Sequence, residues 1–309
     1  MTLEQLRIFV AVAEQEHVTR AARDLNLTQS ATSAAVAALE ARYQTKLFDR
    51  IGRRIVLTDA GRLFLVEAKA VLARAASAET MLADLAGLKR GSLGIGASQT
   101  VGNYWLPAPL QLFRSRYPGI AIRLTMGNSE TVAGLVHDGE ADLGLIEGEI
   151  DDPSLSVTAV AEDEMVVVAA PDHPWLGNPP ASVGAALNAK WVLREPGSGT
   201  RSILYAALAA ENIDPKRLSV SLELPSNEAV RAAVEAGAGV SVLSRLAAAG
   251  SLKAGTLAAV DMKLPMRRFF LLRHKERYVT RAQQAFMDLV VPKKAAGRPK
   301  RVDPSAAVQ

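Results

Sequence analysis

Five polar side chains between positions 28 and 33 have the types and spacing of a helix end that reads DNA. They are Thr28, Gln29, Ser30, Thr32 and Ser33. A glutamine can bond adenine at two points, and serine or threonine can bond bases or phosphates. Apolar residues recur at helical spacing over 28–43, and Thr28 is a suitable helix cap. The buried face is expected to hold Ala31, Ala35 and Leu39, which turns the polar residues outward.

A cationic group follows this predicted helix and consists of Arg50, Arg53 and Arg54. Short apolar runs on both sides of Gly52-Arg53-Arg54 predict a β-hairpin. Its guanidinium groups can neutralise phosphates or enter a minor groove, and the alternative is a solvated surface cluster. Two further helices are predicted upstream, over 3–13 and after a cap at Thr19. Three helices and a hairpin form a winged helix-turn-helix, which favours DNA contact.

Polar groups also follow the predicted strands of the chain beyond residue 90. They occur at Ser98-Gln99-Thr100, Gly127-Asn128-Ser129, Glu147, Glu195-Pro196-Gly197-Ser198-Gly199-Thr200-Arg201 and Ser226-Asn227-Glu228. Ligands of open α/β sheets bind beyond the carboxyl ends of strands, and the amide groups of helix N-termini favour anions. Any one of these residues could instead be a simple helix cap. The convergence of several such ends predicts a small-anion site.

A long helix is predicted over 58–88, between the two groups of polar residues. Apolar side chains recur in it at alternating spacings of four and three: Phe64, Ala68, Val71, Ala75, Ala78, Leu82 and Leu85. This spacing is typical of the seam of a coiled-coil dimer. The alternative is an amphipathic helix that packs on its own domain.

Beyond residue 90 the pattern changes to strands that alternate with helices. Strands are predicted at Leu93–Ala97, Ile120–Met126, Ala141–Ile146, Met165–Ala170, Trp191–Arg194, Leu218–Leu224, Val240–Ser244 and Phe269–Arg273. The first three form a βαβαβ unit with a parallel sheet. We expect two α/β lobes, with chain crossings near Ala161–Glu164 and Pro265–Arg268, that enclose a ligand cleft.

These elements predict an α/β fold with five parts. They are a winged helix-turn-helix DNA-binding domain (1–58), a linker and dimerisation helix (59–89), lobe 1 (90–163 and 268–291) and lobe 2 (164–267) of an effector domain like the two-lobed periplasmic binding proteins, and a disordered basic tail (292–309). In the tail, Gly297-Arg298-Pro299 resembles the core of an AT-hook, which can lie in a narrow A·T minor groove. A solubilising tail is the simpler interpretation.

Charge and composition narrow the class of protein. Residues 1–90 carry 13 Lys and Arg against 10 Asp and Glu, residues 91–291 carry 18 against 21, and residues 292–309 carry 5 against 1. Basic ends around an acidic middle indicate a polyanionic partner that contacts only part of the chain. The 309 residues include no cysteine, which excludes disulfides and thiolate metal sites. They show no secretion signal and no apolar segment long enough to span a membrane, so we expect a cytoplasmic protein without membrane contact.

Enzymatic function is not expected, and neither is a metal or a cofactor. The four histidines, His17, His137, His173 and His274, form no HExxH pair. Gly94-Ile95-Gly96 lacks the third glycine of a dinucleotide-binding motif, and Gly197-Ser198-Gly199-Thr200 lacks the lysine of a P-loop.

The N-terminal region resembles the LysR-type transcriptional regulators. The matching segments are Leu6-Arg7-Ile8-Phe9, Val18-Thr19-Arg20-Ala21-Ala22, Leu27-Thr28-Gln29-Ser30-Ala31-Thr32-Ser33, Leu47-Phe48-Asp49-Arg50 and Leu57-Thr58-Asp59-Ala60-Gly61. His17 and Tyr43-Gln44-Thr45-Lys46 depart from the family pattern. The family layout covers residues 1–291 and implies a winged helix-turn-helix, a dimerising linker helix and a two-lobed effector domain, in a homodimer or homotetramer.

Within that family the effector region resembles a branch that includes regulators of carbon fixation and of sulfur metabolism, among them a sulfite-responsive one. The resemblance rests on Gly127-Asn128-Ser129, Leu143-Gly144-Leu145-Ile146-Glu147-Gly148, Arg194–Arg201 and Ser226-Asn227-Glu228-Ala229-Val230. It implies an effector site lined by Ser98, Thr100, Asn128, Ser129, Glu147 and Thr200.

The expected function is therefore ligand-responsive regulation of transcription. The partners would be double-stranded operator DNA and a small anionic effector such as sulfite or another oxyanion. The alternative is a solute-binding protein that does not touch DNA, which the effector region alone would suggest. Because the Glu147 carboxylate would repel a dianion, we expect it to pair with Arg194 or Arg201, or to accept a proton from the effector.

Overall fold

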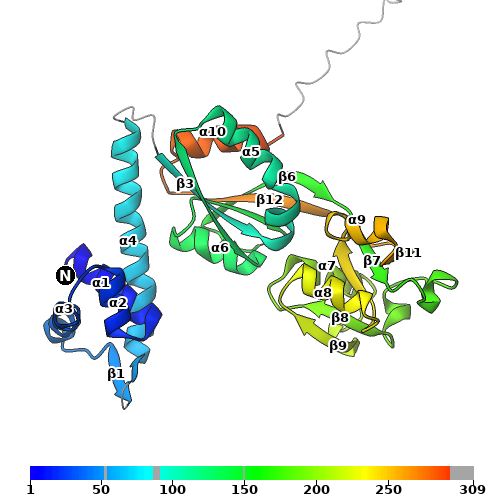
Figure 1. Ribbon diagram of the computed structural model, residues 1–309, viewed down its shortest axis with the longest axis horizontal. Helices are drawn as coiled ribbons and strands as arrows, with labels where there is room; N and C mark the ends of the chain where they lie inside the picture. The colour runs from blue at the N-terminus through cyan, green and yellow to red at the C-terminus, as the bar shows by residue number, and fades with distance from the viewer. Residues whose placement is uncertain (52–53, 86–90, 149, 293–309) are drawn as a thin grey trace, which may run out of the picture.

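The computed structural model describes residues 1–51, 54–85, 91–148 and 150–292. The N-terminal domain consists of α1 (Leu3–Gln15), α2 (Val18–Asp24), α3 (Gln29–Tyr43) and the antiparallel hairpin β1 (Phe48–Ile51) and β2 (Arg54–Leu57). The helix α4 (Asp59–Leu85) follows and connects this domain to the rest of the chain (Figure 1). The predicted winged helix-turn-helix is confirmed.

Local capping explains where the short helices begin. The Thr28 hydroxyl accepts a hydrogen bond from the Ala31 amide at 3.2 Å, as expected for the start of α3. The predicted cap at Thr19 is wrong, because α2 begins at Val18 and its cap lies two residues earlier than predicted. His17 caps it, with Nδ1 accepting from the Arg20 amide at 3.4 Å. An imidazole nitrogen can take the place of the usual hydroxyl acceptor, which the sequence pattern did not indicate.

The core of the N-terminal domain includes part of α4. The Phe9 ring lies 5.4 Å from the Phe48 ring and 4.9 Å from the Phe64 ring of α4. Ala68, also on α4, is 1 % exposed in the same cluster. Two positions of the predicted dimer seam therefore pack within the chain. Val71 and Leu82 are 41 % and 65 % exposed, so the later part of the helix keeps an uncovered apolar side.

Lobe 1 is built on one five-stranded sheet in the order β4-β3-β5-β12-β6. Its strands are β3 (Gly91–Ser98), β4 (Ile120–Gly127), β5 (Leu143–Glu147), β6 (Leu155–Asp163) and β12 (Arg267–His274). The expected parallel unit is present in β4, β3 and β5, whereas β12 runs antiparallel to β5 and β6. The strand β6 was not predicted from the sequence.

Helices cover both faces of this sheet, because its central strands are apolar on both sides. α5 (Pro107–Arg116) and α10 (Arg281–Val290) lie on one face, and α6 (Ser129–Asp138) lies on the other (Figure 1). On β5, Leu143 and Leu145 pack with the first pair of helices, and Ile146 packs with α6. A short π-helical turn (Val101–Trp105) joins β3 to α5.

Lobe 2 contains two smaller sheets around the buried Trp191. β7 (Met165–Ala169) pairs with β10 (Ser241–Ser244) and β11 (Ala258–Val260), and β8 (Lys190–Arg194) pairs in parallel with β9 (Ser219–Leu224). The helices α7 (Gly199–Ala210), α8 (Asn227–Glu235) and α9 (Arg245–Ala254) surround them. The strand β11 and the helix α9 were not predicted. Their sequences are short or rich in alanine, so periodicity is weak there.

The chain passes between the lobes twice, from β6 into β7 and from β11 into β12. Asp163 ends β6 and Arg267 begins β12, so the two crossings lie side by side. The Arg267 side chain is 1 % exposed and bonds Asp163 through Nε, at 3.0 Å, and through Nη2. The Ser244 hydroxyl donates to the other Asp163 oxygen at 2.7 Å. A buried ion pair with these further bonds joins both crossings.

Replacing Arg267 with methionine should lower the free energy of unfolding by about 3–5 kcal/mol, because it leaves the Asp163 carboxylate buried without its counter-ion. Arg268→Met is the matched control on the same strand, since Arg268 is exposed and lies 3.9 Å from Glu162. The control should cost less than about 1 kcal/mol. Urea unfolding followed by tryptophan fluorescence measures both, and equal losses would contradict the assigned role of Arg267.

Candidate functional site

The start of α3 presents most of the predicted DNA-contacting residues to solvent. Thr28, Gln29 and Ser30 are exposed, and Ser33 is half-buried. The Thr28 and Ser30 hydroxyl oxygens lie 3.0 Å apart. These groups stand on one turn of a helix whose opposite side packs against the domain core.

Thr32 does not belong to this exposed group, and the expectation that it faces outward is wrong. It is fully buried, and its hydroxyl donates to the Thr28 carbonyl at 3.0 Å. Thr32, Val36 and Leu39 form the buried side of α3, whereas Ala31, expected there, is exposed. Alanines occur all around this helix, so apolar spacing could not distinguish its two faces.

The hairpin places its arginine positions next to the turn. In the register of β1 and β2, Arg50 is opposite Ile55 and Arg54 is opposite Ile51. Arg53 lies outside the described residues, and so do the side chains of Arg50 and Arg54. The backbone therefore supports the expected wing, and contacts of its guanidinium groups remain a prediction.

The carboxyl ends of three strands of lobe 1 meet lobe 2 at a buried polar cluster. Its members are Ser98, Thr100, Ser129, Glu147 and Thr200, each 4 % exposed or less. The Ser98 hydroxyl bonds the Glu147 carboxylate, and the Ser129 hydroxyl donates to the Glu147 carbonyl at 2.6 Å. Asn128 is half-buried at the edge, where its side-chain amide donates to the Pro196 carbonyl at 3.2 Å. All six residues expected from the family resemblance thus lie between the lobes.

Arg267 supplies the positive charge of this cluster. Its Nη1 donates to the Thr200 hydroxyl at 3.0 Å and lies 3.7 Å from a Glu147 carboxylate oxygen. The expected pairing of Glu147 with Arg194 or Arg201 is wrong. Arg194 bonds Glu195 and Asn227, and Arg201 pairs with Glu223. Sequence reasoning missed Arg267 as a residue of this site. Its only signal was its position at a predicted crossing between the lobes, and arginines are seldom fully buried.

Burial raises the pKa of the Glu147 carboxyl, because the charged form loses its hydration. Arg267, the Thr100 hydroxyl and Arg194 oppose this shift, and Asp163 adds to it. The net effect favours the protonated acid more than in an exposed glutamate. Glu147 is thus a buried group that can gain or lose a proton beside hydroxyl and guanidinium donors.

Direct hydrogen bonds hold the lobes together on the side of the π-helical turn. The Asn227 side-chain amide donates to the Thr100 hydroxyl at 3.0 Å, and the Gln99 side-chain amide donates to the Pro225 carbonyl at 2.8 Å. The Tyr104 hydroxyl donates to Glu228 at 2.8 Å, and burial together with this bond raises the pKa of Tyr104 to about 12. Gln99, Tyr104 and Asn227 were not among the predicted site residues. In this arrangement of the lobes the residues of the cluster are shielded from solvent.

Within the described part of the chain, no three histidine, aspartate or glutamate side chains are grouped so that they could hold a metal ion. No described helix is long and apolar enough to cross a membrane.

Comparison with known proteins connects this geometry to a family. Residues 3–62 match the model of the bacterial regulatory helix-turn-helix proteins of the lysR family, and residues 86–294 match the LysR substrate binding domain. The chain is 38% identical over 294 residues to the HTH-type transcriptional regulator YeiE of Escherichia coli strain K12, covering 94% of this chain and 98% of YeiE. It is 33% identical over 297 residues to the RuBisCO operon transcriptional regulator of Allochromatium vinosum, covering 96% and 97%.

A solved structure extends the likeness to the effector region. The regulatory domain of Synechocystis PCC6803 CcmR in complex with 2-PG superposes with a TM-score of 0.59 at 28% identity, covering 65% of this chain and 96% of that domain. Together with the matches over both regions, the winged helix-turn-helix, the long α4 and the two-lobed domain place the protein: the chain belongs to the LysR family of DNA-binding transcriptional regulators.

Proposed function

We propose that this regulator senses a small anion between its two lobes. The observation that carries the proposal is the buried cluster in which Ser98, Glu147 and Arg267 meet. The Glu147 carboxylate there receives the kinds of bonds that a bound oxyanion would receive, from a hydroxyl and a guanidinium group. An entering anion would share these donors most easily with a protonated Glu147, and its raised pKa makes that protonation less costly.

A protonatable oxyanion such as sulfite suits this site better than sulfate does. The two negative charges of sulfate would face the Glu147 carboxylate in a site with little water, whereas a ligand that carries a proton can share it with that carboxylate. The complex of the CcmR regulatory domain with 2-PG supports a small-molecule effector in this domain. The side chains proposed to bind the effector are those of Ser98, Thr100, Asn128, Ser129 and Thr200.

We further propose that Thr28, Gln29, Ser30 and Ser33 contact the operator. Arg50, Arg53 and Arg54 would bind the phosphates of the DNA or enter its minor groove. Thr32 is not proposed, since it is buried. The dimer would form along the later part of α4, because Val71 and Leu82 of the predicted seam are exposed in the single chain and are free to pack against a second copy. The alternative function, a solute-binding protein without DNA contact, is disfavoured by the match over residues 3–62. A cytoplasmic location stays a prediction. So does a role of the tail (292–309) at A·T-rich DNA, because residues 293–309 lie outside the described part of the chain.

Gln29→Ala should reduce discrimination between operator and random DNA by about 1–3 kcal/mol, the value of one bidentate base contact. Arg53→Ala should instead weaken binding to every DNA and reduce its salt dependence. Gln284→Ala on α10 is the control for the loss of an exposed glutamine elsewhere. Fluorescence anisotropy with both DNAs at several salt concentrations measures this. If Gln29→Ala weakened binding to operator and random DNA equally, Gln29 would not make a base-specific contact.

Leu82→Lys should convert the dimer to a monomer, because two lysines would be buried opposite each other along α4. Leu63→Lys is the matched control, since Leu63 is 75 % exposed on the same helix and lies outside the predicted seam. Sedimentation velocity gives the mass of each variant. Dissociation by Leu63→Lys alone would mean that the helices pair through another face.

Thr200→Ala should abolish binding of sulfite by the full-length protein, whereas Thr200→Ser, which keeps the hydroxyl, should retain it. Wild type should bind sulfite more tightly than sulfate, and Glu147→Gln should narrow that difference because the repelling charge is removed. Titration calorimetry with both anions tests this, and circular dichroism checks folding. Tighter binding of sulfate, unchanged by Glu147→Gln, would show that the proposal is wrong.

A further inference from the structure

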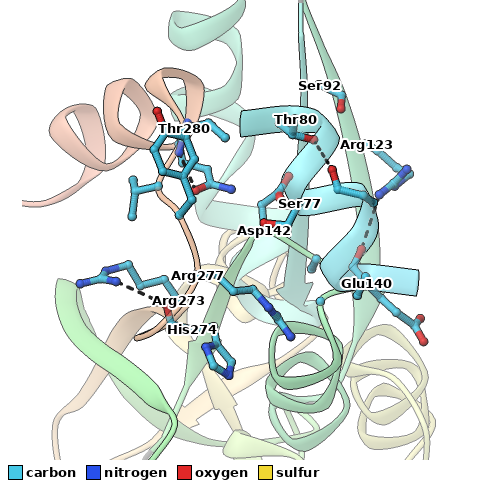
Figure 2. Close-up of a pocket in the computed structure, with 17 residues that line it drawn as sticks. Ser77, Thr80, Ser92, Arg123, Glu140, Asp142, Arg273, His274, Arg277 and Thr280 are labelled. Carbon is cyan, nitrogen blue, oxygen red and sulfur yellow. Dashed lines mark hydrogen bonds between the residues drawn. The ribbon is translucent and has the colours of Figure 1, made fainter. Parts of the chain in front are cut away.

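A cavity lies between α4 and lobe 1, away from the interlobe cluster. Its volume is about 210 Å³, and its walls include Ser77 and Thr80 of α4 and Arg123, Arg273 and Arg277 of lobe 1 (Figure 2). A cavity of this size has room for several waters or one small metabolite.

This cavity and the interlobe cleft lie at opposite ends of the same sheet. Ser92, near the start of β3, lines the cavity, whereas Ser98, at the end of β3, belongs to the interlobe cluster. At about 3.3 Å per residue the two ends of that strand are roughly 20 Å apart. The antiparallel β12 repeats the arrangement, with Arg273 at the cavity and Arg267 at the cluster. A single bound molecule therefore cannot contact both sites.

Three guanidinium groups around the cavity lack a full set of partners. Arg273 Nη1 donates to the His274 carbonyl at 3.3 Å, and Arg123 Nη2 donates to the Glu140 carbonyl at 3.5 Å. Neither forms an ion pair with any residue that the structure describes. Arg277 donates its two Nη groups to carbonyls at the end of α6, and its buried Nε has no hydrogen-bond partner among the described residues.

The acidic residues at the cavity balance this charge only in part, because Glu140 already has a cationic partner and Asp142 is one carboxylate beside three guanidinium groups. The Glu140 carboxylate is bonded at 3.0 Å by Lys69, and the Asp142 carboxylate accepts the Gly94 amide at 2.7 Å. The pKa of Arg277 is lowered, first by burial and then by the nearby Arg74, although Asp138 and Asp142 act in the opposite direction. An excess of positive charge thus remains beside the cavity.

The cavity also spans a junction between parts of the chain. A Cβ atom on Gly139, which ends α6 with a φ of +82°, would lie 2.8 Å from the Cβ of Ala73, so α4 and lobe 1 are in close contact there. Lys69 of α4 bonds Glu14 of the DNA-binding domain at 2.8 Å as well as Glu140 of lobe 1. Anything bound in the cavity would touch both α4 and lobe 1.

We propose that this cavity is a second ligand site, for a small dianion with the chemistry shared by phosphate monoesters and short dicarboxylates. Arg273 and Arg277 supply its counter-charge, and Arg123 and the hydroxyls of Ser77 and Thr80 complete the set of donors. The bound anion holds α4 against lobe 1, and thereby holds the DNA-binding domain in the orientation that α4 gives it.

Titration calorimetry on the full-length protein at constant ionic strength tests the proposal, with inorganic phosphate and succinate as the two probes. At least one probe should bind, and the tighter of the two identifies the ligand as phosphorylated or dicarboxylic. Arg273→Gln should weaken that binding tenfold or more. Arg268→Gln, a matched change on the exposed side of the same strand, should leave it unchanged, as should Thr200→Ala in the interlobe cleft.

Ser77→Asp is a second variant, on the opposite wall, and places a carboxylate where the anion would bind. It should also weaken binding tenfold or more, with an unchanged thermal midpoint in the absence of the probes. Wild-type affinity in both Arg273→Gln and Ser77→Asp, or binding of neither probe, would overturn the proposal. Binding lost in Thr200→Ala and kept in Arg273→Gln would place the anion in the interlobe cleft and would also overturn it.

Discussion

The buried guanidinium of Arg267 is the constraint on which the arrangement of the two lobes depends. A charge out of water must be paired and hydrogen-bonded, and Arg267 meets this need only where four segments come together. Asp163 comes from the first crossing, Glu147 from the end of β5 and Thr200 from the first turn of α7. Asp163 and Glu147 lie on strands of the same sheet as Arg267, so moving the lobes apart would break the bond from Arg267 to Thr200 and the bond from Ser244 to Asp163. The same group that joins the crossings therefore also forms the floor of the proposed effector site.

The close approach of the lobes sets the chemistry of that site. Gly199 shows how close they are, since a Cβ atom there would lie 2.2 Å from the Glu147 carbonyl oxygen. Such contact removes water from Glu147, and this is why its pKa rises although a guanidinium group is near. A carboxyl group that accepts a proton at little cost, beside hydroxyl donors, can adjust to an incoming anion. The interlobe cluster thus combines binding of charge with binding of a proton.

A physical path leads from this cluster to the DNA-binding domain. β3 extends from Ser98 at the cluster to the region that packs on α4, and Lys69 of α4 bonds acidic residues on both sides of it. The early part of α4 belongs to the core of the winged helix-turn-helix, through Phe64 and Ala68. A change at the cleft or at the proposed second anion site therefore acts on elements that are in contact with the DNA-reading domain.

The sequence by itself determined the family, the order of the elements apart from β6, β11 and α9, and the residues at the strand ends, because these follow from local spacing and motif strings. Only the tertiary structure decided which side of α3 is buried, since an alanine-rich helix has faces of nearly equal hydrophobicity and the core selects between them. It likewise decided that Phe64 and Ala68 pack within the chain and that Arg267, rather than Arg194 or Arg201, faces Glu147. The partner of a buried charge is set by which distant segments meet, and no local pattern in the sequence records that meeting.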